Sequence, residues 1–106
     1  MQKNLEIEAM RASAGNVVNV LKSLANTDRL IILCHLTQKE LNVTQIAELT
    51  NIVQPTLSQQ LMMLRKSNVV STRRDGKQIF YSIHDPKLNI ILNTLYEHYC
   101  PKPDQS

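Results

Sequence analysis

The apolar pattern of this chain changes its period once, near Val69, and that change restricts the folds available to it. Up to about Ser67 apolar residues recur at steps of three and four, which indicates a helix. The segments 69–74 and 77–83 are instead rich in β-branched and aromatic residues. Between them, Asp75-Gly76 favours a two-residue type I′ hairpin turn. The sequence therefore predicts a helix followed directly by a β-hairpin.

The rest of the chain is expected to be mostly helical, because only two glycines and four prolines interrupt 106 residues. Apolar spacing predicts helices at 10–25, 30–36, 45–49 and about 55–67, and a last one from Asp85-Pro86 to before Pro101. Residues suited to capping precede three of them: Asn26-Thr27-Asp28 before 30–36, Thr44 before 45–49, and Gln54 before the helix that has Pro55 as its first residue. Residues 39–43 are expected to form a connection. A short helix, a turn, a longer helix and a hairpin make up the winged helix-turn-helix plan, so the fold class is mainly α with a small β-hairpin.

The length allows one domain, 1–106, with about 1–8 and 102–106 expected to be flexible. So small a domain would gain stability from a dimer partner. The longest aliphatic run, residues 30–34, is too short for a membrane span, and the first fifteen residues do not resemble a signal peptide. We therefore expect a cytoplasmic protein with no membrane partner.

The outer side of the predicted fourth helix carries uncharged polar side chains. In a helix-turn-helix motif this helix enters the major groove, where hydroxyl and amide groups can bond to base edges. The candidates share the side of the helix opposite its inward leucines or lie beside it, and they are Gln54, Thr56, Ser58, Gln59 and Gln60, with the apolar Met63 on the same side. The alternative interpretation is a solvated helix face without function.

Positive charge is concentrated around this helix. Five basic residues and one acidic residue lie between Gln54 and His84, whereas the rest of the chain has seven basic and eight acidic residues. Phosphate binding requires such a concentration, because the release of counterions supplies much of the affinity for DNA. The predicted phosphate contacts are Arg65, Arg73, Arg74 and Lys77, and the predicted partner is double-stranded DNA. A hairpin that is charged only for solubility is the alternative.

Three segments of the chain resemble motifs of the ArsR/SmtB family. Residues 21–33 (LKSLANTDRLIIL) resemble its opening helix pair, 54–65 (QPTLSQQLMMLR) its recognition helix, and 73–81 (RRDGKQIFY) its wing. Gln60 stands where the family usually has His. The resemblance implies a homodimeric winged-helix transcriptional repressor that leaves its operator when an inducer arrives. It also implies that the first and last helices form the dimer contact.

The metal-binding positions of this family are mostly not filled by ligands here. Asn42 and Thr44 stand where the arsenic and cadmium site has two thiols. On the last helix, the zinc-type register retains Asp85 and His98 but has Lys87 and Pro101 at the other two positions. We therefore expect neither a metal site nor a cofactor.

The chain has only two cysteines, Cys34 on the second predicted helix and Cys100 at the end of the last. This placement resembles the redox subgroup of the family, the BigR-like and HlyU-like proteins, whose repressors respond to persulfide and polysulfide. The resemblance implies that reactive sulfur species or an oxidant join Cys34 and Cys100 in a di- or polysulfide. The bridge would then move the recognition helices. The alternative is that the cysteines only pack as small apolar side chains.

Two other functions stay open at this point. One is a repressor of the same fold that responds to zinc or arsenic. The other is an antirepressor or protein-interaction winged helix. An enzyme is not expected, because the sequence offers no nucleophile with a neighbouring base and no phosphate-binding loop.

Overall fold

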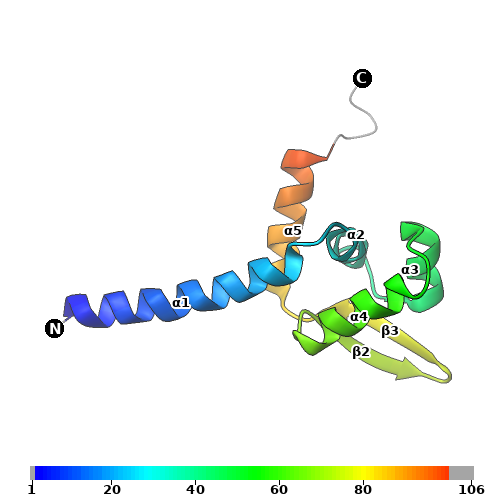
Figure 1. Ribbon diagram of the computed structural model, residues 1–106, viewed down its shortest axis with the longest axis horizontal. Coiled ribbons are helices and arrows are strands. Elements are labelled where there is room, and N and C mark those ends of the chain that lie inside the picture. Colours follow the sequence, from blue (N-terminus) through cyan, green and yellow to red (C-terminus); the bar gives the residue numbers. More distant parts are fainter. Residues whose placement is uncertain (1, 101–106) are drawn as a thin grey trace.

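The computed structural model describes residues 2–100 of the chain, with the side chains of residues 6–100. Its elements are α1 (Gln2–Leu24), α2 (Thr27–Leu36), β1 (Leu41–Asn42), α3 (Val43–Thr50), α4 (Thr56–Lys66), β2 (Val70–Asp75), β3 (Gln78–Ile83) and α5 (Pro86–Tyr99) (Figure 1). The predicted winged helix-turn-helix order is confirmed. Residues 2–8, expected to be flexible, belong to α1, and the expected flexible segment 102–106 lies outside the described residues.

Helix α3 is capped by Asn42, and the prediction that Thr44 caps it is wrong. The Asn42 Oδ1 accepts a hydrogen bond from the Gln45 N–H at 2.9 Å, and the Gln45 Oε1 accepts one from the Asn42 N–H at 2.9 Å. This reciprocal capping box satisfies two backbone donors, and Ala47, three residues after Thr44, cannot complete one there. The predicted connection at 39–43 also contains β1, which the sequence analysis missed.

Helix α4 begins at Thr56, so Pro55 precedes the helix and is not its first residue. Pro55 has no side chain that can cap, and the Gln54 Oε1 accepts a hydrogen bond from the Ser58 N–H at 3.0 Å instead. The predicted inward leucines are confirmed as buried: Leu57, Leu61 and Leu64. Their burial fixes which side of α4 faces solvent.

The hairpin turn lies one residue later than predicted. Asp75 pairs with Gln78, so the two turn residues are Gly76 and Lys77. Gly76 has a φ of 65°, and Lys77 is not among the described residues with positive φ. A positive φ at the first turn residue alone matches a type II′ turn, which requires Gly there. Strand β1 pairs with the other edge of β3, giving the sheet order β1-β3-β2.

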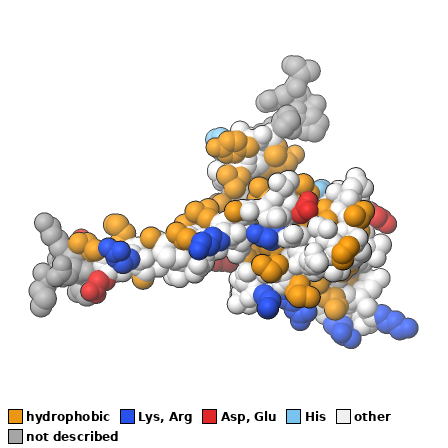
Figure 2. Space-filling model, viewed as in Figure 1, with side chains coloured by type: hydrophobic (Ala, Val, Ile, Leu, Met, Phe, Trp, Pro, Cys, Tyr) orange, Lys and Arg blue, Asp and Glu red, His pale blue; other side chains and the backbone are white. Residues whose placement is uncertain are grey.

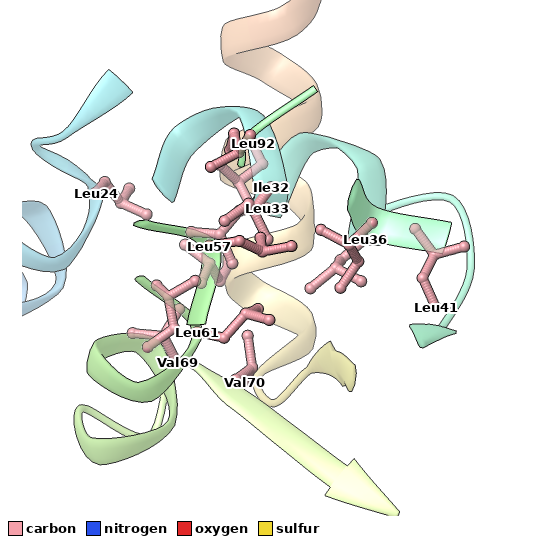
Figure 3. Packing of buried hydrophobic residues seen from close by; sticks show 14 residues of the cluster. Leu24, Ile32, Leu33, Leu36, Leu41, Leu57, Leu61, Val69, Val70 and Leu92 are labelled. Atoms are coloured by element: carbon pink, nitrogen blue, oxygen red, sulfur yellow. The ribbon is translucent and has the colours of Figure 1, made fainter. Parts of the chain in front are cut away.

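The core lies where α2, α4 and α5 meet the sheet (Figure 3). Every buried residue in the described part of the chain is apolar. Among the most deeply buried are Ile32 and Leu33 of α2, Leu57 and Leu64 of α4, and Leu92 of α5. Because α2 packs against both α4 and α5, it links the last helix to the helix-turn-helix.

Helix α1 projects from this core as a long arm (Figure 1) and packs only near its C-terminal end, where it meets α2. The apolar stripe predicted on it is present, but it is exposed except at Leu24. Met10 is 71% exposed and Leu21 is 56% exposed. Figure 2 shows this stripe as a row of hydrophobic side chains along α1. Helix α1 therefore presents an apolar surface that its own chain does not cover.

Candidate DNA-binding surface and thiol pair

The outer side of α4 and the neighbouring hairpin of β2 and β3, called the wing from here on, form one continuous side of the molecule. Lys and Arg side chains line its lower edge in Figure 2, where Figure 1 places α4 and the wing. On α4, Gln59, Met63 and Arg65 are exposed and Thr56 is half-buried. The Gln59 and Arg65 side chains make no hydrogen bond or ion pair to any residue the structure describes. Their polar groups are available to a ligand.

Two of the candidate residues bond to each other at the start of α4. The Gln54 Oε1 accepts hydrogen bonds from the Ser58 Oγ at 2.7 Å and from the Ser58 N–H at 3.0 Å. The amide oxygen of Gln54 is therefore occupied, and its Nε2 group remains a donor. The pair fixes the conformation of the residues that lead into α4.

Gln60, another candidate, is half-buried beside α2. Its Oε1 accepts a hydrogen bond from the Arg29 Nη1 at 3.1 Å. Bidentate pairing with adenine uses both the oxygen and the nitrogen of a glutamine amide. Because Arg29 holds the Gln60 oxygen, only the Nε2 donors remain free in this conformation.

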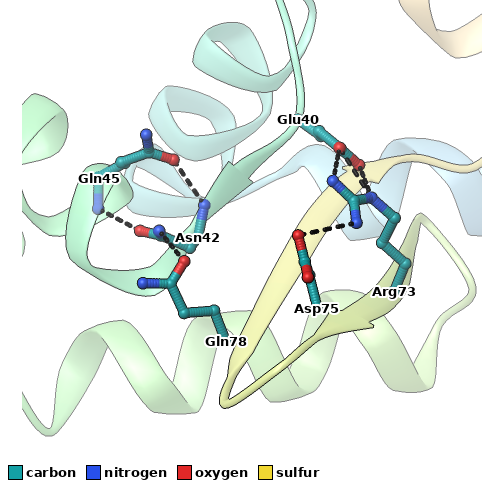
Figure 4. Close-up of polar contacts among 6 residues, drawn as sticks. All are labelled: Glu40, Asn42, Gln45, Arg73, Asp75 and Gln78. Carbon is teal, nitrogen blue, oxygen red and sulfur yellow. Dashed lines mark hydrogen bonds and ion pairs between the residues drawn. The ribbon is translucent and has the colours of Figure 1, made fainter.

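Arg73 of the wing is held by an ion pair that the sequence analysis missed. Its Nε donates to both carboxylate oxygens of Glu40, at 2.8 and 3.0 Å (Figure 4). Its guanidinium lies 4.7 Å from the centre of the Phe80 ring. Asp75 adds a longer ion pair at 3.8 Å. The hydrogen bond from Arg73 holds the pKa of the Glu40 carboxyl below its ordinary value. Arg73 thus anchors the wing to the segment before β1.

A second bond attaches the wing to the helix-turn-helix. The Asn42 Nδ2 donates to the Gln78 Oε1 at 3.1 Å (Figure 4). Arg74 and Lys77, at the tip of the same hairpin, are exposed. Neither of them forms an ion pair within residues 6–100. The wing is therefore attached through Arg73 and Gln78, while the positive charges of the neighbouring Arg74 and Lys77 are unpaired in the described part of the chain.

The two cysteines, called the thiol pair from here on, lie on helices that pack together. Cys34 is half-buried on α2, and Cys100 is exposed at the C-terminal end of α5. Both are free thiols. Burial raises the pKa of the Cys34 thiol, and the negative charge of a nearby Cys100 thiolate raises it further. Cys100 is therefore the thiol that a dissolved reagent meets first.

Two of the positions weighed as metal ligands, Asn42 and Asp85, have other contacts. Asn42 caps α3, and the Asp85 carboxylate accepts a hydrogen bond from the Lys87 N–H at 2.9 Å, which caps α5. Among the described residues, no three His, Cys, Asp or Glu side chains gather as a group that could hold a metal ion.

None of the helices within residues 2–100 combines the length and apolar character needed to cross a membrane.

Comparison with known proteins decides the family. The profile of the family described as "Bacterial regulatory protein, arsR family" matches residues 26–72, which include α2, α3 and α4. A biofilm growth-associated repressor of Xylella fastidiosa is 41% identical over 99 residues, covering 93% of this chain and 87% of the relative. This chain belongs to the ArsR family. As a member of a family of regulatory proteins it is a DNA-binding regulator, which agrees with the prediction that it is not an enzyme.

Two solved structures share this fold over about nine-tenths of the chain. The transcriptional repressor BigR from Xylella fastidiosa matches with a TM-score of 0.82 and 42% identity, over 90% of this chain and 97% of that one. Reduced HlyU from Vibrio cholerae matches with a TM-score of 0.82 and 32% identity, over 89% of this chain and 99% of that one. The predicted resemblance to the BigR-like and HlyU-like subgroup is confirmed.

Proposed function

We propose that this ArsR-family protein is a homodimeric repressor that binds double-stranded operator DNA and is released by reactive sulfur species or oxidation through a Cys34–Cys100 bridge. The observation that carries the DNA-binding part is the junction of an uncharged polar helix side with unpaired cations on the adjacent wing. The first suits base edges and the second suits phosphates. The similar protein from Xylella fastidiosa is named a repressor, which supports the direction of regulation.

The contacts of each candidate residue suggest different roles on DNA. Thr56 and Gln59 would contact bases from the N-terminal half of α4. Arg65, Arg74 and Lys77, which have no ion pair in the described part of the chain, would contact phosphates. The remaining four candidates already bond within the protein and would hold the surface in shape: Gln54, Ser58, Gln60 and Arg73.

Dimerisation is supported by the uncovered apolar faces of α1 and α5. Val17 and Val18 on α1 and Ile91 and Tyr99 on α5 are each at least 45% exposed. A projecting helix with an exposed apolar face is only marginally stable alone in water, and burial against a second copy would stabilise it. A contiguous apolar surface of this kind marks an interaction site. A two-fold dimer would present two copies of α4 to successive half-sites of an operator.

The thiol pair can form a bridge in two balanced steps. A Cys100 thiolate attacks a sulfane sulfur of a polysulfide, and a shortened polysulfide leaves with the electrons of the broken S–S bond. The Cys34 thiolate then attacks the Cys100 Sγ and displaces hydrosulfide, which leaves a disulfide between the two residues. The thiols lose two electrons and two protons, and one sulfane sulfur is reduced to hydrosulfide. A bridge that retains additional sulfur spans a longer gap.

Helix α2 provides the route from the bridge to the DNA-binding surface. It carries Cys34, packs against α5 and also packs against α4. Tethering α2 to the end of α5 would therefore shift α4 and change the separation of the two recognition helices. Couplings of this kind are typically about 1–3 kcal/mol, which corresponds to roughly 5- to 150-fold in affinity.

The test is DNA release by polysulfide in three proteins: the wild type, Cys34→Ser and Cys100→Ser. All three should bind a selected operator equally when reduced, because neither thiol lies on α4 or the wing. Polysulfide should release the wild type only. Release of Cys34→Ser would exclude the bridge, and release by zinc or arsenite alone would favour a metal-responsive repressor. Operator affinity no higher than non-specific affinity would favour a protein-interaction module.

A further inference from the structure

The guanidinium of Arg29 joins three helices at one point. Its Nε donates to the Ser23 carbonyl oxygen at 2.8 Å, and its Nη2 donates to the Lys22 carbonyl oxygen at 3.3 Å. Both carbonyls belong to the last turn of α1. Its Nη1 donates to the Gln60 Oε1 of α4 at 3.1 Å. Arg29 itself lies in the first turn of α2.

These hydrogen bonds satisfy carbonyl groups at the end of α1 and orient the bond that Arg29 makes to Gln60 on α4. The last four carbonyls of a helix have no partner within the helix, and a cation beside them also interacts favourably with the helix dipole. Hydrogen bonds from a charged donor are stronger than those between neutral groups. The guanidinium presents its donors in a rigid plane, so the position of the α1 end constrains the direction of the bond to Gln60.

We propose that Arg29 and Gln60 are positioning residues that fix α4 relative to the end of α1 and thereby set the spacing between the two α4 helices of the dimer. The inference rests on the proposed function, in which α1 lies in the dimer contact and α4 enters the major groove. Dimeric helix-turn-helix proteins bind half-sites about one helical turn apart. If α4 were held less rigidly against α1, the dimer would bind half-sites at several different spacings.

The experiment compares DNA with two half-sites and DNA with one. Selection from random DNA with the wild-type protein gives the half-site and its spacing. Affinities are then measured for the selected spacing, for the spacing lengthened by two base pairs, and for a single half-site. For Gln60→Ala we expect the preference for the selected spacing to fall at least about fivefold, the lower end of typical couplings between sites. Its affinity for the single half-site should stay within about twofold of the wild type, since contacts to DNA are unchanged.

Gln59→Ala is the matched control, because Gln59 is the same residue type one position earlier and its side chain is exposed. It should lose affinity for the single half-site and keep the spacing preference. Arg29→Lys should behave like Gln60→Ala, and the double variant should lose no more than either alone. Should Arg29→Lys fail to fold, the Gln60 variant still decides the question.

Two results would overturn the inference in distinguishable ways. If Gln60→Ala loses affinity for the single half-site and keeps its spacing preference, Gln60 is a DNA contact and not a positioning residue. If the wild-type protein selects no sequence, or stays monomeric in sedimentation, the proposed function fails and the inference fails with it.

Discussion

Replacing Arg74 with glutamine should weaken the salt dependence of DNA binding by a predictable amount. Arg74 is exposed near the wing tip and has no ion pair in the described part of the chain, so its charge is available to a phosphate. The logarithm of the binding constant falls with that of salt concentration with a slope of about −0.9 per neutralised phosphate. A dimer loses two such contacts, so the slope should become less steep by about 1.8. The ratio of the wild-type binding constant to that of Arg74→Gln should therefore fall about 12-fold when the salt concentration rises from about 50 to about 200 mM.

The assay is fluorescence anisotropy with one labelled operator at several KCl concentrations. The matched control is the double variant Glu40→Gln/Arg73→Gln, which removes the anchoring ion pair without changing the net charge. Its slope should stay near that of the wild type. If the double variant changes the slope as much as Arg74→Gln does, Arg73 contacts phosphate on DNA and the assignment of charges on the wing is wrong.

Three further predictions concern the core, the thiols and the wing anchor. Leu92→Ala removes a fully buried side chain of α5 and should lower the free energy of unfolding in urea by about 2–5 kcal/mol; a loss under about 1 kcal/mol would contradict this packing. In Cys100→Ser protein, burial still raises the pKa of Cys34. The alkylation rate of Cys34 should therefore keep rising past about pH 8.5, the ordinary pKa of cysteine. A rate that reaches its plateau below that pH would contradict the raised pKa. Because the pKa of Glu40 is lowered by Arg73, the stabilisation from this pair is present above the unfolded pKa of about 4.3 and is lost as the pH falls through the folded value. The difference in unfolding free energy between the wild type and Glu40→Gln should therefore be constant from about pH 6 to 8 and disappear in acid, and a difference that grows in acid would refute the assignment.

The element order could be predicted because each helix has local signals. The leucines of α4 recur at helical spacing, and Asp85-Pro86 combines a capping carboxylate with a proline that suits the first helical turn. A local signal was also available for the start of α3. Gln45 lies three residues after Asn42, which is the spacing of a capping box, and Thr44 has no such partner.

The position of the hairpin turn depends on pairing across the strands. With Asp75-Gly76 as the turn residues, Arg74 would lie opposite Lys77, and like charges directly opposite each other are destabilising. The observed register pairs Asp75 with Gln78 and Arg74 with Ile79. Turn propensity alone favoured Asp-Gly, and the pairing of the flanking residues selected the turn one position later.

The candidate DNA-binding residues were identifiable as a group, but their contacts were not. Periodicity places Gln59 and Gln60 on one side of a helix, yet only the fold shows that Gln60 bonds to Arg29, 31 positions earlier. The anchor between Glu40 and Arg73 spans 33 positions in the same way. Such long-range polar pairs leave no trace in hydrophobic spacing, so charge counting treated Arg73 and Arg74 as equivalent.

The coupling of thiol chemistry to DNA release is tested most directly by following both in one titration. Reduced protein bound to labelled operator is titrated with polysulfide, and each sample is divided between intact mass spectrometry and a gel shift. Bridged protein is identified by the loss of two hydrogen atoms, alone or together with a gain of whole sulfur atoms, and by the absence of an alkylatable thiol. We expect the bridged fraction to equal the fraction released from DNA at every point. Fully bridged protein that stays bound, or release before any bridge forms, would contradict it.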